Sequence, residues 1–393
     1  MTDYVPRRPE TRLLTSRFFV LLAATASFGL AFSAYFLLPK YLAVVLGADP
    51  ATIGGLNAIS MFASVVAMPF VGIQVDRLGR KGFGIAGALV FALASGTFYF
   101  IDEIGIVLWI VRILQGFAFT MFYVAMSTLA TDLAPEEKLG QAIGLFGGVM
   151  IATNALGPAL AEWGATAYGW PFVFAMTSVM SIGAIILTFG IIEKNERTRD
   201  AIESSITELL ASPSLIRVLI AAILVGVTMG TTFTFYQPWA LSLGYTEISG
   251  YLVGFAICAM FVRIVLGSVA DKFGRLNVAI GSLSLYIFAP LCLIYVDSIG
   301  LFYTGAILGI AHGLFFPALN AVALEQVSGA GRGKGMAVYH GAFNIGFASG
   351  SYLLGYVAMN EGYPTIFSIA SFTCILGLII LINISLTQED AKV

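Results

Sequence analysis

Long apolar stretches alternate along the chain with short polar breaks that are rich in Gly, Pro and charged residues. A helix needs about 20 apolar residues to cross a bilayer, and twelve stretches reach about that length. We expect helices over residues 18–40, 51–74, 83–101, 105–130, 139–163, 170–192, 214–243, 248–270, 277–296, 299–325, 334–358 and 363–386. Because the stretches are continuously apolar, they do not fit the strands of a membrane barrel, which alternate over about ten residues. The pattern predicts an all-α membrane protein with twelve transmembrane helices.

The composition excludes several other classes of protein. Of the 393 residues, 59% are hydrophobic and only 11% are charged, against about 25% charged in an ordinary soluble protein. With a mean hydropathy of +0.92, the chain fits neither a soluble globule nor a disordered segment. The net charge of −2 gives no electrostatic footprint for nucleic acid. We interpret Cys258, Cys292 and Cys374 as packing residues, because each lies within an apolar stretch.

The positions of the basic residues predict how the chain is oriented. Cytoplasmic loops of membrane proteins carry an excess of Lys and Arg. When the N-terminus is placed in the cytoplasm, all but three of the 20 Lys and Arg fall on the cytoplasmic side. Lys40 falls at the outer face, and Arg112 and Arg263 fall within spans. We therefore expect a multi-pass protein of the plasma (inner) membrane with both termini in the cytoplasm.

The longest polar segment covers residues 193–213, between the sixth and seventh spans. It separates an N-terminal six-helix unit, residues 1–192, from a C-terminal one, residues 214–393. An apolar face within the segment suits an amphipathic helix on the cytoplasmic surface. A merely solvated linker fits the sequence equally well.

The two halves contain a repeated motif. Residues 72–82 read GIQVDRLGRKG, and residues 267–277 read GSVADKFGRLN. At a constant offset of 195 residues, the positions Gly72, Asp76, Gly79 and Arg80 return as Gly267, Asp271, Gly274 and Arg275. Both copies follow the second span of a half, so the pattern indicates an internal duplication.

With these motifs the chain resembles the major facilitator superfamily of secondary transporters, and more narrowly its drug/proton antiporters. The superfamily pattern Gly-x-x-x-Asp-Arg-x-Gly-Arg-Arg/Lys is met by residues 72–81, which include Arg77. The fourth span carries RILQG at 112–116, similar to the superfamily's Arg-x-x-Gln-Gly pattern. Gly157 and Pro158 match the start of the Gly-Pro motif of many antiporters, although Ala161 and Glu162 stand where a glycine pair often follows. The resemblance implies two pseudo-symmetric six-helix bundles, the major facilitator fold.

The resemblance also implies a conformational switch at the cytoplasmic ends of the helices. Asp76 would face the start of span eleven near Lys334, and Asp271 would face the start of span five near Lys138. Ordinary positive-inside loop charge is the alternative. The implied switch set is Gly72, Asp76, Arg77, Gly79, Arg80, Asp132, Gly267, Asp271, Gly274, Arg275 and Glu325.

Two further carboxylates extend this network. Asp132 and Glu325 lie at the cytoplasmic ends of spans four and ten and could pair with Arg80 and Arg275. We expect the network to hold the halves together when the site faces outward, and to break when the site opens inward.

Charged residues within spans are rare, because removing them from water is costly. Arg112, Gln115, Phe119 and Tyr123 are spaced as one helical stripe, which we expect to face a central cavity. Arg112 could bind an anionic group or lower the pKa of a nearby carboxylic acid. The alternative is an Arg that snorkels or caps carbonyl groups. For Arg263 we favour a structural role.

Other polar and aromatic residues complete the candidate substrate or proton pathway. They are Asn154, Glu162, Tyr236, Gln237, His312, Phe316, Asn320, His340 and Asn344. His312 and His340 could carry a proton or could be uncharged packing residues. Glu162 could bind a proton or simply reach water. Tyr236 and Gln237 fit an outer gate, and an aromatic belt equally well. Two histidines alone do not make a metal site.

These observations predict a secondary transporter that moves a small organic solute by alternating access. Proton-coupled efflux of an amphipathic compound is our first interpretation, and uptake or exchange of an organic anion is the alternative. A non-transporting receptor on the same fold is a third candidate. An enzyme is not expected, because the spans offer no catalytic constellation. The expected partners are the solute, protons and the lipid bilayer, for a monomer with no cofactor and no nucleic acid.

Overall fold

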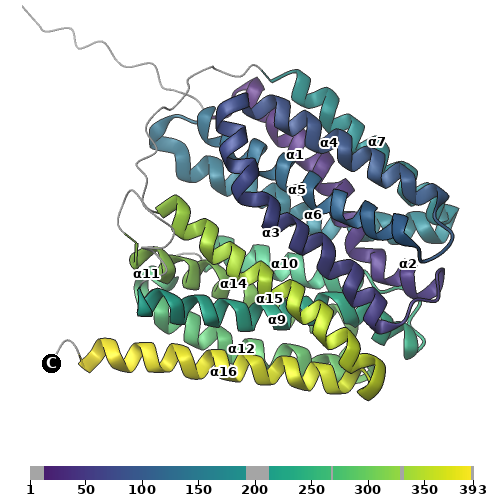
Figure 1. Cartoon of the computed structure of the whole chain (residues 1–393). Coiled ribbons are helices and arrows are strands. Elements are labelled where there is room, and N and C mark those ends of the chain that lie inside the picture. Colours follow the sequence, from purple (N-terminus) through teal and green to yellow (C-terminus); the bar gives the residue numbers. More distant parts are fainter. Residues whose placement is uncertain (1–12, 192–211, 267–268, 328–331, 391–393) are drawn as a thin grey trace, which may run out of the picture.

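The computed structural model describes residues 13–191, 212–266, 269–327 and 332–390 (Figure 1). These residues form helices and connecting turns, without a strand among them. The first half contains α1 (Ser16–Ala34), α2 (Leu38–Val44), α3 (Pro50–Leu78), α4 (Arg80–Thr97), α5 (Ile106–Asp132), α6 (Leu139–Tyr168) and α7 (Trp170–Phe189). The second contains α9 (Pro213–Ser242), α10 (Gly250–Val265), α11 (Val269–Phe273), α12 (Arg275–Ile294), α13 (Val296–Ile299), α14 (Leu301–Glu325), α15 (Arg332–Glu361) and α16 (Tyr363–Asp390). Short 3-10 helices lie at Tyr35–Leu37, Phe98–Phe100 and Glu136–Lys138.

Twelve long helical segments stand where the apolar stretches predicted them, so the predicted fold class is confirmed. Ten are long and apolar enough to cross a membrane, and the first of these joins α1 and α2 into one segment, Ser16–Val44. The helix α10 has only 16 residues and ends at Val265. The eighth span was therefore predicted too long, because the repeated motif and the separate helix α11 follow that point.

Glycines of the repeated motif separate the second and third long helices of each half. Gly79 lies between α3 and α4 with φ 101° and ψ 145°. Gly274 lies between α11 and α12 with φ 87° and ψ 133°. Side chains rarely adopt this conformation, and glycine does so at little cost. The duplicated sequence thus gives the same turn in both halves.

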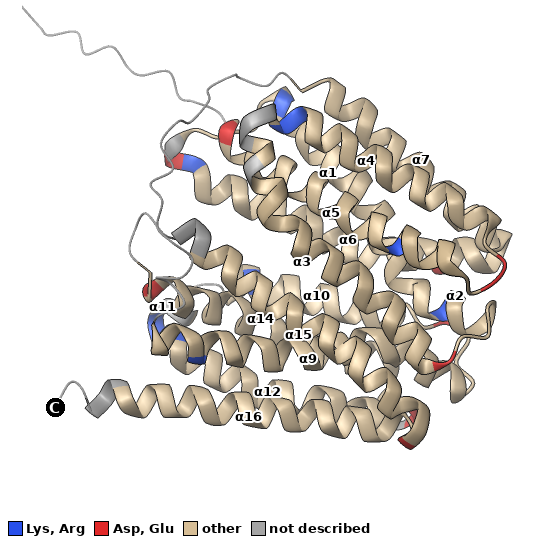
Figure 2. Ribbon diagram, viewed as in Figure 1, with Lys and Arg blue, Asp and Glu red and all other residues tan. Residues whose placement is uncertain are grey.

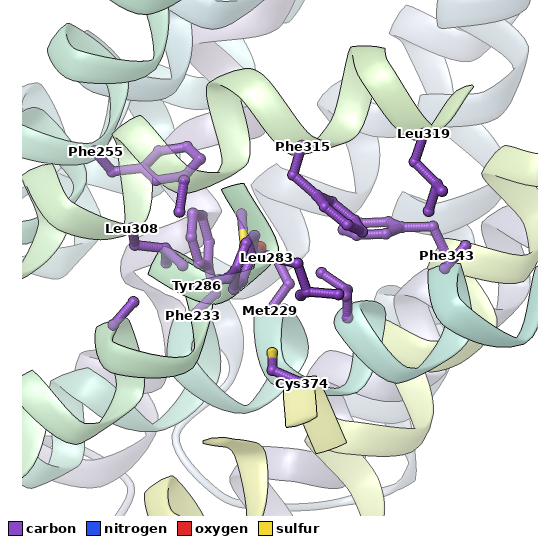
Figure 3. Packing of buried hydrophobic residues seen from close by; sticks show 14 of the residues in the cluster. Met229, Phe233, Phe255, Leu283, Tyr286, Leu308, Phe315, Leu319, Phe343 and Cys374 are labelled. Carbon is purple, nitrogen blue, oxygen red and sulfur yellow. The ribbon is translucent and has the colours of Figure 1, made fainter. Parts of the chain in front are cut away.

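Helices α1–α7, the N half, and α9–α16, the C half, form two bundles that lie side by side (Figure 1). Each bundle has its own apolar core. In the N half, Phe28 stacks on Phe122 with ring centroids 3.9 Å apart. Figure 3 shows part of the C-half core, where Tyr286 and Phe315 lie among aliphatic side chains. Four buried residues of the N half also belong to the C-half core: Ala34, Leu37, Ala161 and Val173.

Charged residues gather at the two ends of the bundles, with apolar helix between them (Figure 2). We call the end that carries Ser16, Gly79 and Gly274 the inner end, and the end that carries Lys40 and Glu162 the outer end. The predicted connector, 193–213, lies almost wholly outside the described residues. Ser212 near its end caps α9, since its side chain accepts a hydrogen bond from the Leu215 amide.

Candidate transport pathway and outer seal

A buried ion pair of the N half holds the C half at the outer end. Lys40 Nζ on α2 lies 2.6 Å from Glu162 Oε1 on α6, and Glu162 is only 5% exposed. Lys40 also donates to the Thr246 carbonyl at 2.5 Å. The Glu162 carboxylate accepts hydrogen bonds from the amides of Ile248 and Ser249 at 2.7–3.0 Å. Both members of the pair therefore bind the loop between α9 and α10.

The Glu162 carboxylate occupies the N-terminus of α10. Ser249 immediately precedes Gly250, the first residue of that helix. The first amides of a helix lack partners within it, and the helix dipole favours a negative charge there. An ionised Glu162 thus caps a helix of the opposite half. We call the contacts between the halves at the outer end the outer seal. Glu162 is buried in this seal and does not simply reach water.

Gln237 on α9 makes a second contact between the halves. Its Oε1 accepts a hydrogen bond from the Lys40 amide at 3.1 Å, and its Nε2 donates to the Phe36 carbonyl. The neighbouring Tyr236 is fully buried and stacks on Tyr251 with ring centroids 4.2 Å apart. Because a belt residue would face lipid, the aromatic-belt interpretation of Tyr236 is wrong.

Arg112 on α5 is buried, and three of its N–H groups bind neighbouring groups of the N half. Its Nε donates to the Leu56 carbonyl at 3.0 Å, and its Nη1 donates to Gln115 Oε1 at 2.7 Å. Its Nη2 donates to Asn57 Oδ1 at 3.4 Å. Within the described part of the chain, no carboxylate forms an ion pair with it. Arg112 therefore caps the Leu56 carbonyl group, which is the structural interpretation that the sequence left open.

A chain of hydrogen bonds runs from Arg112 into the C half. Asn57 Nδ2 donates to Thr234 Oγ1 at 3.1 Å. The Thr234 hydroxyl lies 2.9 Å from the Ser351 hydroxyl, which donates to the Gly230 carbonyl at 3.2 Å. The helices α3, α9 and α15 are thereby joined through polar groups near the outer end.

The backbones of α3 and α15 touch near the outer end. A Cβ atom at Gly54 of α3 would lie 2.1 Å from the Ser351 carbonyl oxygen of α15. Further along the same two helices, a Cβ at Gly72 or at Gly341 would have nothing within 4 Å. Only a residue without a side chain permits the close approach at Gly54.

The first turns of α6, near the inner end, are covered by few neighbouring side chains. A helix packed between neighbours exposes one face, but the first turns of α6 are exposed on several faces. The exposed residues there are Leu139, Gly140, Gln141, Ile143, Gly144 and Leu145. Within the described residues, every hydrogen bond between the halves lies at the outer end. Among the described residues, the two halves are therefore held together at the outer end.

Two ion pairs of the inner end stand where the repeat placed them. Arg80 Nε lies 3.2 Å from Asp132 Oδ2, and Arg275 Nη1 lies 2.8 Å from Glu325 Oε1. Each pair joins two helices of the same half. The Arg80 side chain is 7% exposed, whereas that of Arg275 is 41% exposed. The pseudo-repeat therefore preserves the partners but not their burial.

The rest of the predicted switch lies outside what the structure describes. This applies to the side chains of Asp76, Arg77, Asp271 and Lys334 and to the whole of Gly267. Their expected positions opposite spans five and eleven stay predictions, as does the switching role of the set.

An aromatic ladder runs along the N half from the outer seal toward the inner end. Phe36 contacts Phe32 with ring centroids 5.6 Å apart, and Phe32 stacks on Phe119 at 4.1 Å. Phe119 stacks on Tyr123 at 5.5 Å, and Tyr123 contacts Phe146 at 5.6 Å. The predicted stripe on α5 thus divides. Arg112 and Gln115 are buried and bond to each other, whereas Phe119 and Tyr123 belong to the ladder.

Two other candidate residues of the C half, His312 and His340, contact Phe316 on α14. Its ring lies 5.2 Å from that of His312, 5.1 Å from that of His340 and 5.1 Å from that of Phe343. His312 is buried, and its Nδ1 lies 3.2 Å from the Tyr286 hydroxyl. His340 is only partly buried and has no hydrogen bond within the described chain.

Three predicted asparagines are not brought into a common site. Oδ1 of Asn320 is buried without a partner among the described residues. The side chains of Asn154 and Asn344 are partly buried and make no hydrogen bond in that part of the chain. The described residues also contain no group of three or more metal-ligating side chains.

Sequence reasoning missed several residues of the seal. Lys40 was placed at the outer face only as an exception to the charge rule, and Asn57, Thr234 and Ser351 were not singled out. Polar residues within apolar stretches are the signal that could have found them. Their partners lie in other helices, up to 206 residues away along the chain, so spacing could not reveal the pairs.

The chain belongs to the Major Facilitator Superfamily, whose family model matches residues 19–300 and again 252–392. The superfamily comprises transporters, so this multi-pass membrane protein is a transporter and not an enzyme. The fold agrees: a mutant of the nucleoside transporter NupG superimposes with a TM-score of 0.79 at 16% identity. That match covers 94% of this chain and 99% of the other.

Relatives identified by sequence have names that span several substrates. The chain is 22% identical over 347 residues to a cis,cis-muconate transport protein of Acinetobacter baylyi, a match covering 79% of this chain and 82% of the relative. It is 24% identical over 335 residues to multidrug resistance protein MdtG of a Rahnella species, covering 81% and 80%. A multi-drug resistance efflux pump PmrA homolog of Lactococcus lactis is 24% identical over 321 residues, covering 77% and 78%.

Proposed function

We propose that the protein is a secondary transporter that exports a small amphipathic organic compound in exchange for protons, by alternating access. The proposal rests on one observation: within the described residues, every hydrogen bond between the halves lies at the outer end. In a transporter of this kind, two repeats rock about a fixed site near the bilayer midplane. We propose the described conformation as the inward-open one, with both termini in the cytoplasm of a cell bounded by this inner membrane.

The two domains of the cycle are residues 1–192 and 214–393, and a single copy of the chain suffices. Outward opening requires the loop between α9 and α10 to leave Lys40 and Glu162. It also requires α3 to separate from α15 at Gly54. The pairs Arg80–Asp132 and Arg275–Glu325 stay within their halves, so each can hold its bundle rigid while the bundles rock.

Amphipathic substrates and export are supported by two observations. The aromatic ladder from Phe36 to Phe146 offers planar apolar surface from the seal toward the inner end. Relatives at 24% identity bear names of multidrug resistance and efflux proteins. A solute that enters from the open inner end and leaves when the seal opens would be exported.

For the proton we propose His340 rather than Glu162. Glu162 must be ionised to hold the loop before α10, so a proton bound there would keep the outer end open and block the return. His340 is partly exposed and has no hydrogen bond within the described chain, whereas His312 is buried against Tyr286. Histidine changes its charge near physiological pH.

Uptake or exchange of an organic anion is a second candidate. It is favoured by the absence of any described carboxylate paired with Arg112. A relative at 22% identity is named as a transporter of cis,cis-muconate. Uptake is opposite in direction to export, and exchange requires an anion on both sides of the membrane, so flux measurements separate the candidates.

The test is solute flux in proteoliposomes under an imposed pH gradient. We expect a solute to move against its gradient when protons move the other way, and His340→Gln to retain only flux down the solute gradient. A matched control is Asn360→Gln, at an exposed position of α15. Flux that ignores the pH gradient would refute proton coupling, and no flux of any solute class would refute transport itself.

A further inference from the structure

The side-chain amide of Gln237 lies within the backbone hydrogen-bond pattern of the first span. In an α-helix, the amide of each residue donates to the carbonyl group four residues earlier. The Lys40 amide and the Phe36 carbonyl are such a pair, but both bind the carboxamide of Gln237 on α9. Gln237 Oε1 accepts from the Lys40 amide at 3.1 Å, and Nε2 donates to the Phe36 carbonyl. A side chain of the C half thus takes the place of one helical hydrogen bond in the N half.

The first span is interrupted at this point. Helix α1 ends at Ala34, a 3-10 turn covers Tyr35–Leu37, and α2 begins at Leu38. Pro39 gives one reason, because proline has no N–H group to donate to the Tyr35 carbonyl. That carbonyl accepts from the Leu38 amide instead. Proline explains the loss of one helical hydrogen bond, and a side chain inserted into the helix explains the loss of the next.

The carboxamide can hold this interruption only while the halves touch. Gln237 is fully buried, and a buried amide needs partners for its donor and its acceptor. When the outer seal opens, the carboxamide leaves with α9 and water can hydrate it. The Lys40 amide and the Phe36 carbonyl lose their partner at the same moment, but their spacing allows them to bond to each other. Opening therefore exchanges hydrogen bonds and leaves no backbone group unpaired.

The residue whose carbonyl Gln237 binds also joins the aromatic rings of the two halves. The Phe36 ring contacts Phe32 of the ladder with centroids 5.6 Å apart, and Phe233 of the C half with centroids 6.1 Å apart. Phe233 precedes Gln237 by four residues on α9, so both side chains lie on the same face of that helix. This face of α9 thus holds both the backbone and the ring of Phe36.

We propose that Gln237 is a positioning residue of the transport cycle. With the outer seal closed, its carboxamide replaces the hydrogen bond between the Lys40 amide and the Phe36 carbonyl. It thereby holds the Phe36 ring between the ladder and Phe233. When the seal opens, the backbone bond forms, the interruption shrinks to the kink at Pro39, and the Phe36 ring leaves Phe233. This inference rests on the proposed transport function and adds how the first span responds to opening.

Solid-state NMR of the full-length protein in lipid bilayers tests this exchange. Isotope labels are placed on the phenylalanine carbonyl carbon and the lysine amide nitrogen. Phe36 and Lys40 are the only Phe and Lys in this sequence with Lys four residues after Phe, so other pairs give a constant background. We expect Gln237→Leu to shorten the distance between the two labels, as the amide nitrogen and carbonyl oxygen approach the helical value of about 2.9 Å. An unchanged distance would overturn the proposal.

A second variant separates positioning from local packing. Glu162→Gln keeps Gln237 but removes the ion pair that binds the loop before α10. We expect the same shortening, because the carboxamide leaves as the seal opens. If the outer end opens while the distance keeps its wild-type value, Gln237 merely packs against a bent helix and the positioning role is refuted. The matched control is Gln141→Leu at an exposed position of α6, which should keep the wild-type distance.

Flux measurements keep this inference separate from the proposed function. Shortening in both variants, without flux of any solute through the wild type, would uphold the exchange of hydrogen bonds and refute transport. Solute export by the wild type, without shortening in either variant, would uphold transport and refute the exchange.

Discussion

At the outer end an ion pair of the N half reaches across to the C half, whereas the two described ion pairs of the inner end each stay within one half. Glu162 is buried and Lys40 is partly buried, and both bind the loop before α10. Arg275 and Glu325 are partly solvated. Among the described ion pairs, the one that contacts the opposite half thus lies at the outer end, and the two that join helices of one half lie at the inner end.

This difference suits the two conformations of the proposed transport cycle. A buried ion pair contributes little net stability but costs much when one partner is removed. Such a pair suits a seal, because its loss shifts the equilibrium between states strongly. Exposed pairs are typically weak and are screened by salt. Changes at the two ends should therefore differ greatly in size.

The largest effect is expected from Glu162→Gln. It removes the counter-charge of Lys40, whose side chain is 13% exposed, and removing one partner of a fully buried pair costs about 3–5 kcal/mol, which is the upper bound here. We expect the outer end to open. The distance between spin labels at Asp102→Cys and Glu361→Cys, in a background without the native cysteines, should lengthen.

The control for this change is Glu103→Gln, which alters an exposed carboxylate of the outer end. Its label distances should match the wild type. An unchanged distance distribution in Glu162→Gln would contradict the importance of the pair to the seal.

A smaller effect is expected from Gly54→Ala. The new methyl group would clash with the Ser351 carbonyl oxygen, and overpacking costs about 1–3 kcal/mol. Gly72→Ala changes the same helix where a Cβ meets nothing within 4 Å. The same label pair should lengthen in the first variant and not in the second. Equal behaviour of the two would mean that the close approach does not hold the seal.

The two inner pairs should differ from each other. Asp132→Asn removes the partner of a nearly buried Arg80, at a cost of about 1 kcal/mol or more. Glu325→Gln breaks an exposed pair and should cost less than about 1 kcal/mol. Thermal unfolding of both variants measures the difference. If Glu325→Gln were the more destabilising, burial would not set the strength of these pairs.

The smallest effect is expected from Asp49, which caps α3 at the outer end. Its Oδ1 accepts from the Thr52 amide at 2.8 Å, and this hydrogen bond lowers the pKa of the carboxyl group. A lowered pKa in the folded state stabilises the fold above the carboxyl's unfolded-state pKa. That contribution is lost as the pH falls through the folded-state pKa. Because the group is exposed, Asp49→Asn should lose only a few tenths of a kcal/mol at neutral pH.

Melting curves of the wild type and Asp49→Asn between pH 7 and pH 3 provide the measurement. The two should differ at pH 7 and converge at pH 3. A gap that widens toward low pH would have the wrong sign for a depressed carboxyl pKa.

Much of the fold could be predicted, because the apolar stretches and the repeated motif consist of residues that are close together in the sequence. The inner pairs were foreseen for the same reason, since Arg80 and Arg275 occupy equivalent positions of a duplicated motif. The seal could not be predicted. Lys40 and Thr246 are 206 residues apart, and no periodic pattern connects them.

Arg263, in the last turn of α10, shows the same limit: its Nε is buried without a hydrogen-bond partner among the described residues. The sequence places it within a span, and there a carbonyl cap and an open pathway look alike. Arg112 had the same ambiguity and turned out to donate to the Leu56 carbonyl. Only the packing of neighbouring helices decides which arginine finds partners.

By itself, the sequence determined that this chain crosses a membrane as helices, that it is duplicated, and where charges gather at its ends. These properties follow from the hydration of single residues and from local backbone geometry. The tertiary structure decided which charges meet, which arginine is left without a partner, and which end of the interface is closed. Those outcomes depend on how two rigid bundles are placed against each other, and one sequence permits more than one such placement.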